Sequence, residues 1–208
     1  MCLEPVIGLS GQLGSGKSSL ASILAQRNSC PRAAFGDYLR DVATGRGLES
    51  DRASLQQLGE EQIALGWDAF CSAVLNHFGW KTGRGLVVDG IRHVDALKTL
   101  SRMICPQSVF LVHLTINEEL RHNRLLSRDG VQAVFDNHEK HSTEADVKEA
   151  LPLAANMIVD AARPAELLAD EIMDAVLPKL ISTRASPLFP FSHELAPSAS
   201  AMYSSELN

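Results

Sequence analysis

The chain has 208 residues, of which 45% are hydrophobic and 21% are charged. This length favours one α/β domain with a full core over two independent domains. The net charge of −6 argues against nucleic acid or an anionic membrane as the main partner. An anionic ligand therefore has to be held by local arginine and lysine side chains.

The cysteine pattern and the N-terminus indicate the compartment. No C-x-x-C pair occurs, so neither a zinc site nor a disulfide framework is expected. The first strand is expected close to Met1, which leaves no room for a signal peptide, and no apolar run has membrane-spanning length. We expect a cytoplasmic protein with reduced thiols, either a monomer or a small homo-oligomer. The cysteines are Cys2, Cys30, Cys71 and Cys105.

The first predicted elements are a short apolar strand over residues 6–10, a glycine-rich turn, and a helix from Ser18. The turn and the helix start contain a complete G-x-x-x-x-G-K-[ST] pattern in its strand-to-helix context. Its backbone N–H groups and the helix N-terminus attract phosphate oxygens, and Lys17 reaches the β- and γ-phosphates. We expect ATP at this turn and Mg²⁺ on Ser18. The expected nucleotide-binding residues are Gly11, Gln12, Leu13, Gly14, Ser15, Gly16, Lys17, Ser18 and Ser19.

Strands and helices alternate along the rest of the chain. Asp37 is expected to cap the second helix, and Asn117 is expected to cap a later one. The alternation predicts an α/β protein with a three-layer α/β/α P-loop fold, in which helices cover both faces of a parallel five-stranded sheet. The further expected strands are residues 33–35, 85–89, 109–114 and 157–159. The further expected helices are residues 38–44, 51–65 (starting at Asp51 or Ser54), 67–78, 94–102, 118–128, much of 131–155, and 164–180.

Charged residues follow several of the predicted strands. Ligands of open parallel sheets bind beyond the carboxyl ends of the strands, so these residues are candidates for one site. Asp89 ends the apolar run 85–88, where P-loop enzymes keep an acid that holds Mg²⁺ directly or through water. A helix-capping role for Asp89 is the alternative. Arg40 and Arg92 suit phosphate recognition because a guanidinium binds two oxygens at once, although both also fit a solvated helix surface.

Three segments resemble the nucleoside monophosphate kinases of the adenylate kinase type and the related dephospho-coenzyme A kinases. Phe35-Gly36-Asp37-Tyr38-Leu39-Arg40 resembles their G-D-x-[LI]-R segment. Asp89-Gly90-Ile91-Arg92 resembles D-G-[FI]-P-R with one residue missing. Arg124-Leu125-Leu126-Ser127-Arg128 is similar to the R-x-x-x-R that enters the lid. The resemblance covers roughly residues 5–180, and it is particularly close to dephospho-coenzyme A kinase-type proteins.

The resemblance implies roles for these residues. Asp37, Arg40 and Arg92 would bind the phosphate acceptor, Arg124 would contact ATP, and the catalytic set would be Lys17, Asp37, Arg92 and Arg128. It implies a kinase domain over residues 1–181, with a helical acceptor-binding insertion at 37–80 and a short lid at 121–142. Residues 182–208 are rich in Ser, Pro and Ala and are expected to be disordered.

The lid departs from the family pattern because it is short. Beyond Asp129 it offers only His138, Lys140 and His141, and the two histidines lack a nearby third ligand for a metal.

The resulting hypothesis is a kinase that uses ATP and Mg²⁺ to phosphorylate a small, nucleotide-like acceptor, either a nucleoside monophosphate or dephospho-coenzyme A. Asp37 is the candidate base if the acceptor group is a hydroxyl, and no base is required if it is a phosphate. The alternative is a P-loop regulatory protein or ATPase without acceptor chemistry, which the short lid favours. A nucleic-acid end kinase would need a basic groove that the composition does not indicate.

Overall fold

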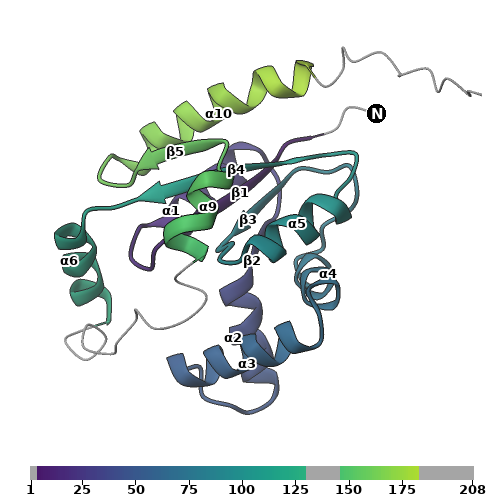
Figure 1. Cartoon of the computed structure of the whole chain (residues 1–208), viewed down its shortest axis with the longest axis vertical. Coiled ribbons are helices and arrows are strands. Elements are labelled where there is room, and N and C mark those ends of the chain that lie inside the picture. The colour runs from purple at the N-terminus through teal and green to yellow at the C-terminus, as the bar shows by residue number, and fades with distance from the viewer. Residues whose placement is uncertain (1–3, 130–145, 183–208) are drawn as a thin grey trace, which may run out of the picture.

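The computed structural model describes residues 4–129 and 146–182 (Figure 1). Within them, five strands form an all-parallel sheet in the order β2-β3-β1-β4-β5, which confirms the expected architecture. The central strand β1 is buried along its whole length. The strands are β1 (Val6–Gly11), β2 (Arg32–Ala34), β3 (Leu86–Asp89), β4 (Val109–Thr115) and β5 (Met157–Asp160).

Helices connect successive strands and cover the sheet. In Figure 1, α10 lies at the top of the molecule, whereas α2 and α3 lie at the bottom. The helices are α1 (Lys17–Arg27), α2 (Phe35–Gly45), α3 (Arg52–Ala64), α4 (Trp67–His77), α5 (Val94–Met103), α6 (Glu118–Asp129), the π-helical turn η1 (Asp146–Ala150), α9 (Leu151–Ala154) and α10 (Ala165–Ser182). Among the described residues, no helix is long and apolar enough to cross a bilayer.

Two apolar clusters lie on opposite faces of the sheet. In the first, Leu20 and Leu24 of α1 pack with Ile172 of α10 against strand residues such as Val112. In the second, side chains of α4, α5 and α9 pack against the other face; they include Phe70, Val74, Leu100 and Leu151. Consecutive side chains of a strand point to opposite faces, so the continuous apolar run 86–88 supplies both clusters. The sheet is therefore the middle layer of a three-layer structure.

The predicted start of the second helix is wrong. The helix α2 begins at Phe35, and its N-cap residue is Ala34, which has no capping side chain. Asp37 lies inside the first turn, where its carboxylate binds arginine side chains and does not cap the helix. Phe35, the last residue of the predicted strand 33–35, is instead the first residue of this helix.

Other predicted helix starts are confirmed. Asp51 is the N-cap residue of α3, and its side chain accepts a hydrogen bond from the Ser54 N–H at 3.0 Å. Asn117 accepts a hydrogen bond from the Glu119 N–H at 2.8 Å at the start of α6. Asp89 does not cap the helix that follows it, because the N-cap residue of α5 is His93.

Part of the predicted lid and all but the first residue of the predicted tail lie outside the described residues. These parts are residues 130–145, which contain His138, Lys140 and His141, and residues 183–208. The predicted helical segment 131–155 is described only from Asp146, where it consists of η1 and α9. Ser182, with which the predicted tail begins, is the last residue of α10.

Candidate functional site

The loop between β1 and α1 depends on its glycines, as Gly11 and Gly16 show. At Gly11, a Cβ atom would lie 2.5 Å from the carbonyl oxygen of Leu114 on β4, so a larger residue would push β1 away from β4. Gly16, the N-cap residue of α1, has φ of 86°, a left-handed conformation that favours glycine. The chain can therefore turn sharply and present the first N–H groups of α1 to the space above the sheet, as an anion-binding loop requires.

Lys17 holds this loop together. Its side chain is buried, with the residue 7% exposed, and its Nζ donates hydrogen bonds to the carbonyl oxygens of Gly11 at 2.6 Å and Gln12 at 2.7 Å. A third contact joins Nζ to the Ser15 hydroxyl at 3.3 Å. The ammonium group therefore lies beside the N-terminus of α1, and both contribute positive charge at the same place.

A cavity of about 380 Å³ lies between this loop and the β5–α10 connection. It is lined by Ser15, Gly16 and Ser19 on one side and by residues 161–165 on the other. Arg124 of α6 joins the two sides, because its guanidinium donates to the Ala161 carbonyl at 2.9 Å and to the Ser15 carbonyl at 3.4 Å. The volume is typical of a small-molecule site, and it lies directly beside the anion-binding loop.

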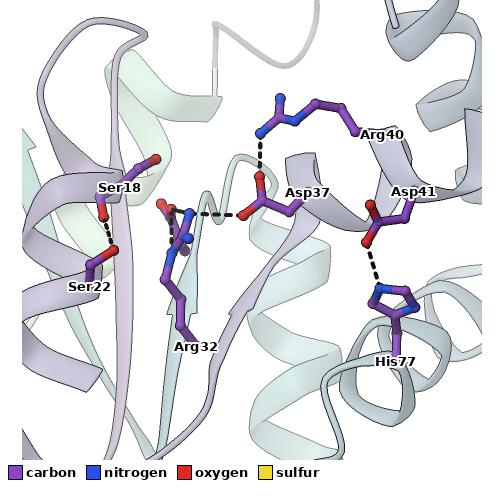
Figure 2. A network of polar contacts seen from close by, with 8 residues as sticks. Ser18, Ser22, Arg32, Asp37, Arg40, Asp41 and His77 are labelled. Carbon is purple, nitrogen blue, oxygen red and sulfur yellow. Dashed lines mark hydrogen bonds and ion pairs between the residues drawn. The ribbon is translucent and has the colours of Figure 1, made fainter. Parts of the chain in front are cut away.

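An ion-pair network extends from β3 to α2. Arg32, the first residue of β2, donates to Asp89 Oδ2 from Nη2 at 2.7 Å and from Nε at 3.2 Å. The same Nη2 lies 3.0 Å from Asp37 Oδ2, and Asp37 Oδ1 accepts a hydrogen bond from Arg40. Figure 2 shows Arg32 and Arg40 on either side of Asp37. Two carboxylates and two guanidinium groups thus alternate in space.

Arg32 is the residue that sequence reasoning missed. Asp89 lies at the end of β3 with a side chain only 5% exposed, and such a buried carboxylate requires a compensating positive charge. Arg32 supplies that charge from the neighbouring strand. The only sequence signal was a basic residue directly before the predicted strand 33–35, and such residues are common on protein surfaces.

Ser18 and Asp89, the predicted metal ligands, suit Mg²⁺ by chemistry. Ser18 is exposed in the first turn of α1, while Asp89 follows β3, which pairs with β1. A hydroxyl and a carboxylate are the hard oxygen ligands that Mg²⁺ takes together with phosphates and water. In the described part of the chain, no group of three or more His, Cys, Asp or Glu side chains forms a protein-only metal site.

The four predicted arginines lie on α2, on the connection between β3 and α5, and on α6. Arg40 is on α2 beside Asp37, and Arg92 lies in the connection between β3 and α5, half-buried. Both elements follow the carboxyl ends of strands at the edge where the anion-binding loop follows β1. Arg124 lies on the other side of that loop, against the cavity. The backbone of Arg128 belongs to the last turn of α6, and its side chain lies outside the described residues.

Two buried polar side chains also lie close to the site. Ser10 and His113 are neighbours on β1 and β4, and neither Ser10 Oγ nor His113 Nδ1 has a hydrogen-bond partner within the described residues. Burial lowers the pKa of His113, and the nearby charge of Lys17 lowers it further. His113 is therefore neutral at pH 7. The sequence signal was a polar residue inside each of two apolar strands.

These features define a P-loop protein with the three-layer fold of the small-molecule P-loop kinases. Residues 7–149 match the AAA_18 family, described as an AAA domain, and the chain belongs to that family. A curated relative, a UPF0200 protein from Aeropyrum pernix, is 27% identical over 160 residues, which cover 74% of this chain and 83% of the relative.

Solved kinase structures share the fold. Shikimate kinase from Acinetobacter baumannii, in complex with shikimate, superimposes with a TM-score of 0.54 and 17% identity, covering 86% of this chain and 96% of that one. A gluconokinase from Sinorhizobium meliloti has a TM-score of 0.51 and 16% identity, covering 88% and 98% of the two chains. The expected three-layer fold of P-loop kinases is thus confirmed.

Proposed function

We propose that the protein is an ATP-dependent kinase that transfers the γ-phosphate to a small, nucleotide-like acceptor, either a nucleoside monophosphate or dephospho-coenzyme A. One observation carries the proposal: the anion-binding loop and the arginine-bearing elements lie at one edge of the sheet. The network from Asp89 through Arg32 and Asp37 to Arg40 supports this, because it joins the acid at the end of β3 to the start of α2.

ATP would bind with its phosphates on the loop of residues 11–18 and its nucleoside in the adjoining cavity. Lys17 and the N-terminus of α1 would stabilise the negative charge of the γ-phosphoryl group during transfer. Arg124 would contact the nucleotide, since its guanidinium lines the cavity and holds Ser15. Ser18 and Asp89 would hold Mg²⁺, which neutralises phosphate charge when it is bound.

The acceptor would bind over α2, α3 and α4, within residues 37–80, where Arg40 and Arg92 would orient it. An acceptor oxygen forms a bond to the γ-phosphorus while the bond from that phosphorus to the β–γ bridging oxygen breaks, and ADP leaves. Arg92 and Arg128 would stabilise the γ-phosphoryl group in the transition state of the transfer. Residues 121–142 would act as a short lid that excludes water.

The contacts of Asp37 favour an acceptor that reacts through a phosphate, as a nucleoside monophosphate does, over one that reacts through a hydroxyl, as dephospho-coenzyme A does. Each of its carboxylate oxygens already contacts a guanidinium group, Oδ1 that of Arg40 and Oδ2 that of Arg32. A carboxylate held in this way orients positive charge toward an anion. Proton removal from a hydroxyl would require one of these contacts to open, whereas transfer to a phosphate requires no base.

A coupled assay of ADP formation tests the proposal. Purified protein is incubated with ATP and Mg²⁺, and nucleoside monophosphates and dephospho-coenzyme A are added one at a time. The kinase gives ADP and a phosphorylated product only with its acceptor. ADP formation that is independent of every acceptor would support the alternative of an ATPase or nucleotide-dependent regulator. The Lys17→Ala variant controls for contaminating kinases.

A further inference from the structure

The structure supplies Asp89 with an internal counter-cation. The Asp89 carboxylate is almost fully buried, and Arg32 binds its Oδ2 through two nitrogen atoms. Removing the positive partner of a buried carboxylate is strongly destabilising, so the pair is a substantial part of the local structure. Yet Asp89 is also the acid that suits a metal accompanying nucleotide phosphates.

One carboxylate oxygen cannot serve both cations equally. A guanidinium group at 2.7 Å occupies the oxygen that faces it, and a divalent ion at the same carboxylate would repel it. Both contacts of Arg32 are to Oδ2, and repulsion between the two cations weakens these contacts when Mg²⁺ binds at Asp89, directly or through water. The affinity of the site for the metal includes the free-energy cost of that weakening.

Arg32 has a second anion within reach. Its Nη2 lies 3.0 Å from Asp37 Oδ2 (Figure 2). This distance is only slightly longer than the 2.7 Å from the same nitrogen to Asp89 Oδ2. The Arg32 side chain is 26% exposed, so it is not fixed by packing on all sides. A guanidinium that leaves Asp89 can therefore remain paired with Asp37, at the start of the helix that carries Arg40.

We propose that Arg32 is a positioning residue that neutralises Asp89 until Mg²⁺ binds and then shifts toward Asp37, its second partner, on the acceptor side. The inference rests on the proposed function, because it assigns Asp89 to the metal and Asp37 to the acceptor region. Arg32 thereby couples the two regions. Because such coupling is reciprocal, an anion that draws Arg32 toward Asp37 also favours the metal at Asp89.

The Mg²⁺ dependence of ADP binding tests the inference without any turnover. ADP affinity is measured by calorimetry in EDTA and over a series of Mg²⁺ concentrations, which gives the concentration for half-maximal enhancement. In Arg32→Ala, Asp89 has no competing cation, so this concentration falls about tenfold relative to the wild type. ADP affinity in EDTA stays unchanged, since Arg32 contacts carboxylates and not the anion-binding loop.

Two further variants keep the test valid if Arg32→Ala does not fold. In Asp37→Asn, Arg32 loses its second carboxylate and is held more firmly by Asp89, so the required Mg²⁺ concentration rises. In Arg32→Lys, a single ammonium group replaces the forked guanidinium. The Mg²⁺ concentration for half-maximal enhancement then falls by less than in Arg32→Ala. Arg102→Ala, which breaks a surface ion pair with Asp68 between α4 and α5, is the matched control and leaves the requirement unchanged.

The outcomes separate this inference from the proposed function. If the wild type binds ADP and all variants require the same Mg²⁺ concentration, Arg32 is a structural ion-pair partner and the inference is overturned alone. A rise in Arg32→Ala, or a fall in Asp37→Asn, overturns it in the same way. If the wild type does not bind ADP, the proposed function fails and the inference fails with it.

Discussion

Ser10 and His113 lie opposite each other on β1 and β4, because their Cα atoms are register partners in the parallel sheet. Ser10 is 0% and His113 is 4% exposed, and in the described part of the chain neither Ser10 Oγ nor His113 Nδ1 has a hydrogen-bond partner. A buried polar group without a partner costs about 1–3 kcal/mol. These strands therefore carry a local instability directly below the anion-binding loop.

Ser10→Ala removes the unsatisfied hydroxyl with little change in volume. We expect the free energy of unfolding to rise by about 1 kcal/mol, since the desolvation cost of the hydroxyl disappears. Urea denaturation monitored by circular dichroism measures the change. Ser22→Ala, at an exposed position on α1, is the control. A clear loss of stability in Ser10→Ala would mean that the hydroxyl is hydrogen-bonded in solution, for example to a buried water molecule.

The stability of the protein is expected to fall in mild acid partly because of His113. Burial, and then the charge of Lys17, lower its pKa below the ordinary value of 6.5 in the folded state. The unfolded state therefore binds a proton more readily, so stability is retained above pH 6.5 and decreases as the pH falls from there toward the lowered folded value. The pKa of His93 is also lowered, mainly by burial, so His93 contributes to the same loss of stability with falling pH.

His113→Leu tests this pH dependence. The variant is expected to lose less stability than the wild type between pH 7 and pH 5, as measured by denaturation at each pH. His122→Gln on the exposed surface of α6 is the control. Parallel curves for the wild type and His113→Leu would contradict the assignment.

Lys17→Ala is expected to abolish phosphoryl transfer, with a loss of roughly a thousandfold or more, because the charge that stabilises the migrating group is removed. Its contacts with the Gly11 and Gln12 carbonyls are also lost, so the loop should bind ADP more weakly. Turnover and ADP calorimetry are the measurements. Lys98→Ala, which affects only an exposed pair with Asp95, should match the wild type.

Arg124→Ala is expected to weaken nucleotide binding about tenfold, since charge-assisted hydrogen bonds contribute about 1.5–3 kcal/mol. The side chain links Ser15 of the loop to Ala161 beside the cavity, and its loss affects both. ADP calorimetry measures the effect, and Asn123→Ala on the exposed side of the same helix is the control. Unchanged ADP affinity would exclude the cavity as the nucleoside site.

Arg92→Ala is expected to raise the KM for the acceptor by about tenfold or more while leaving the KM for ATP unchanged. The reason is its place after β3, on the acceptor side of the sheet edge, away from the cavity that Arg124 lines. Initial rates over a matrix of both substrate concentrations separate the two constants. An equal loss of ATP affinity in Arg92→Ala and Lys17→Ala would contradict this division of roles.

Local patterns predicted the parts of the site that are built from consecutive residues. The loop of residues 11–18 is encoded by its own glycines and lysine, and the apolar run before Asp89 is sufficient to indicate a buried strand. The start of α2 was not predictable in the same way. Ala34, the N-cap residue, offers no capping side chain, and Phe35 looks like the end of an apolar strand. Phe35 nevertheless begins the helix, with its side chain packed in the core.

Arg32 was missed because Asp89, the buried carboxylate that it neutralises, is distant in sequence. Asp89 lies 57 positions away, and the two residues meet only because β2 and β3 pair in parallel with Ala34 opposite Asp89. No motif, periodicity or spacing in the sequence predicts that β2 pairs with β3. The alternation of strands and helices predicted a parallel sheet, but contacts across it require the strand order, which comes from the structure.

The separation of the two apolar clusters by the sheet has an evolutionary consequence. The cavity proposed for the nucleotide is lined by Leu20, Leu114 and Leu168 of one cluster, whereas the proposed acceptor helices α2 and α4 pack through Phe35 and Phe70 of the other. Mutations that reshape one binding surface therefore leave unchanged the apolar cluster that supports the other. A lineage with this architecture can change its acceptor while retaining its phosphate donor. New acceptor specificities can then arise without changes to the region proposed to bind the donor.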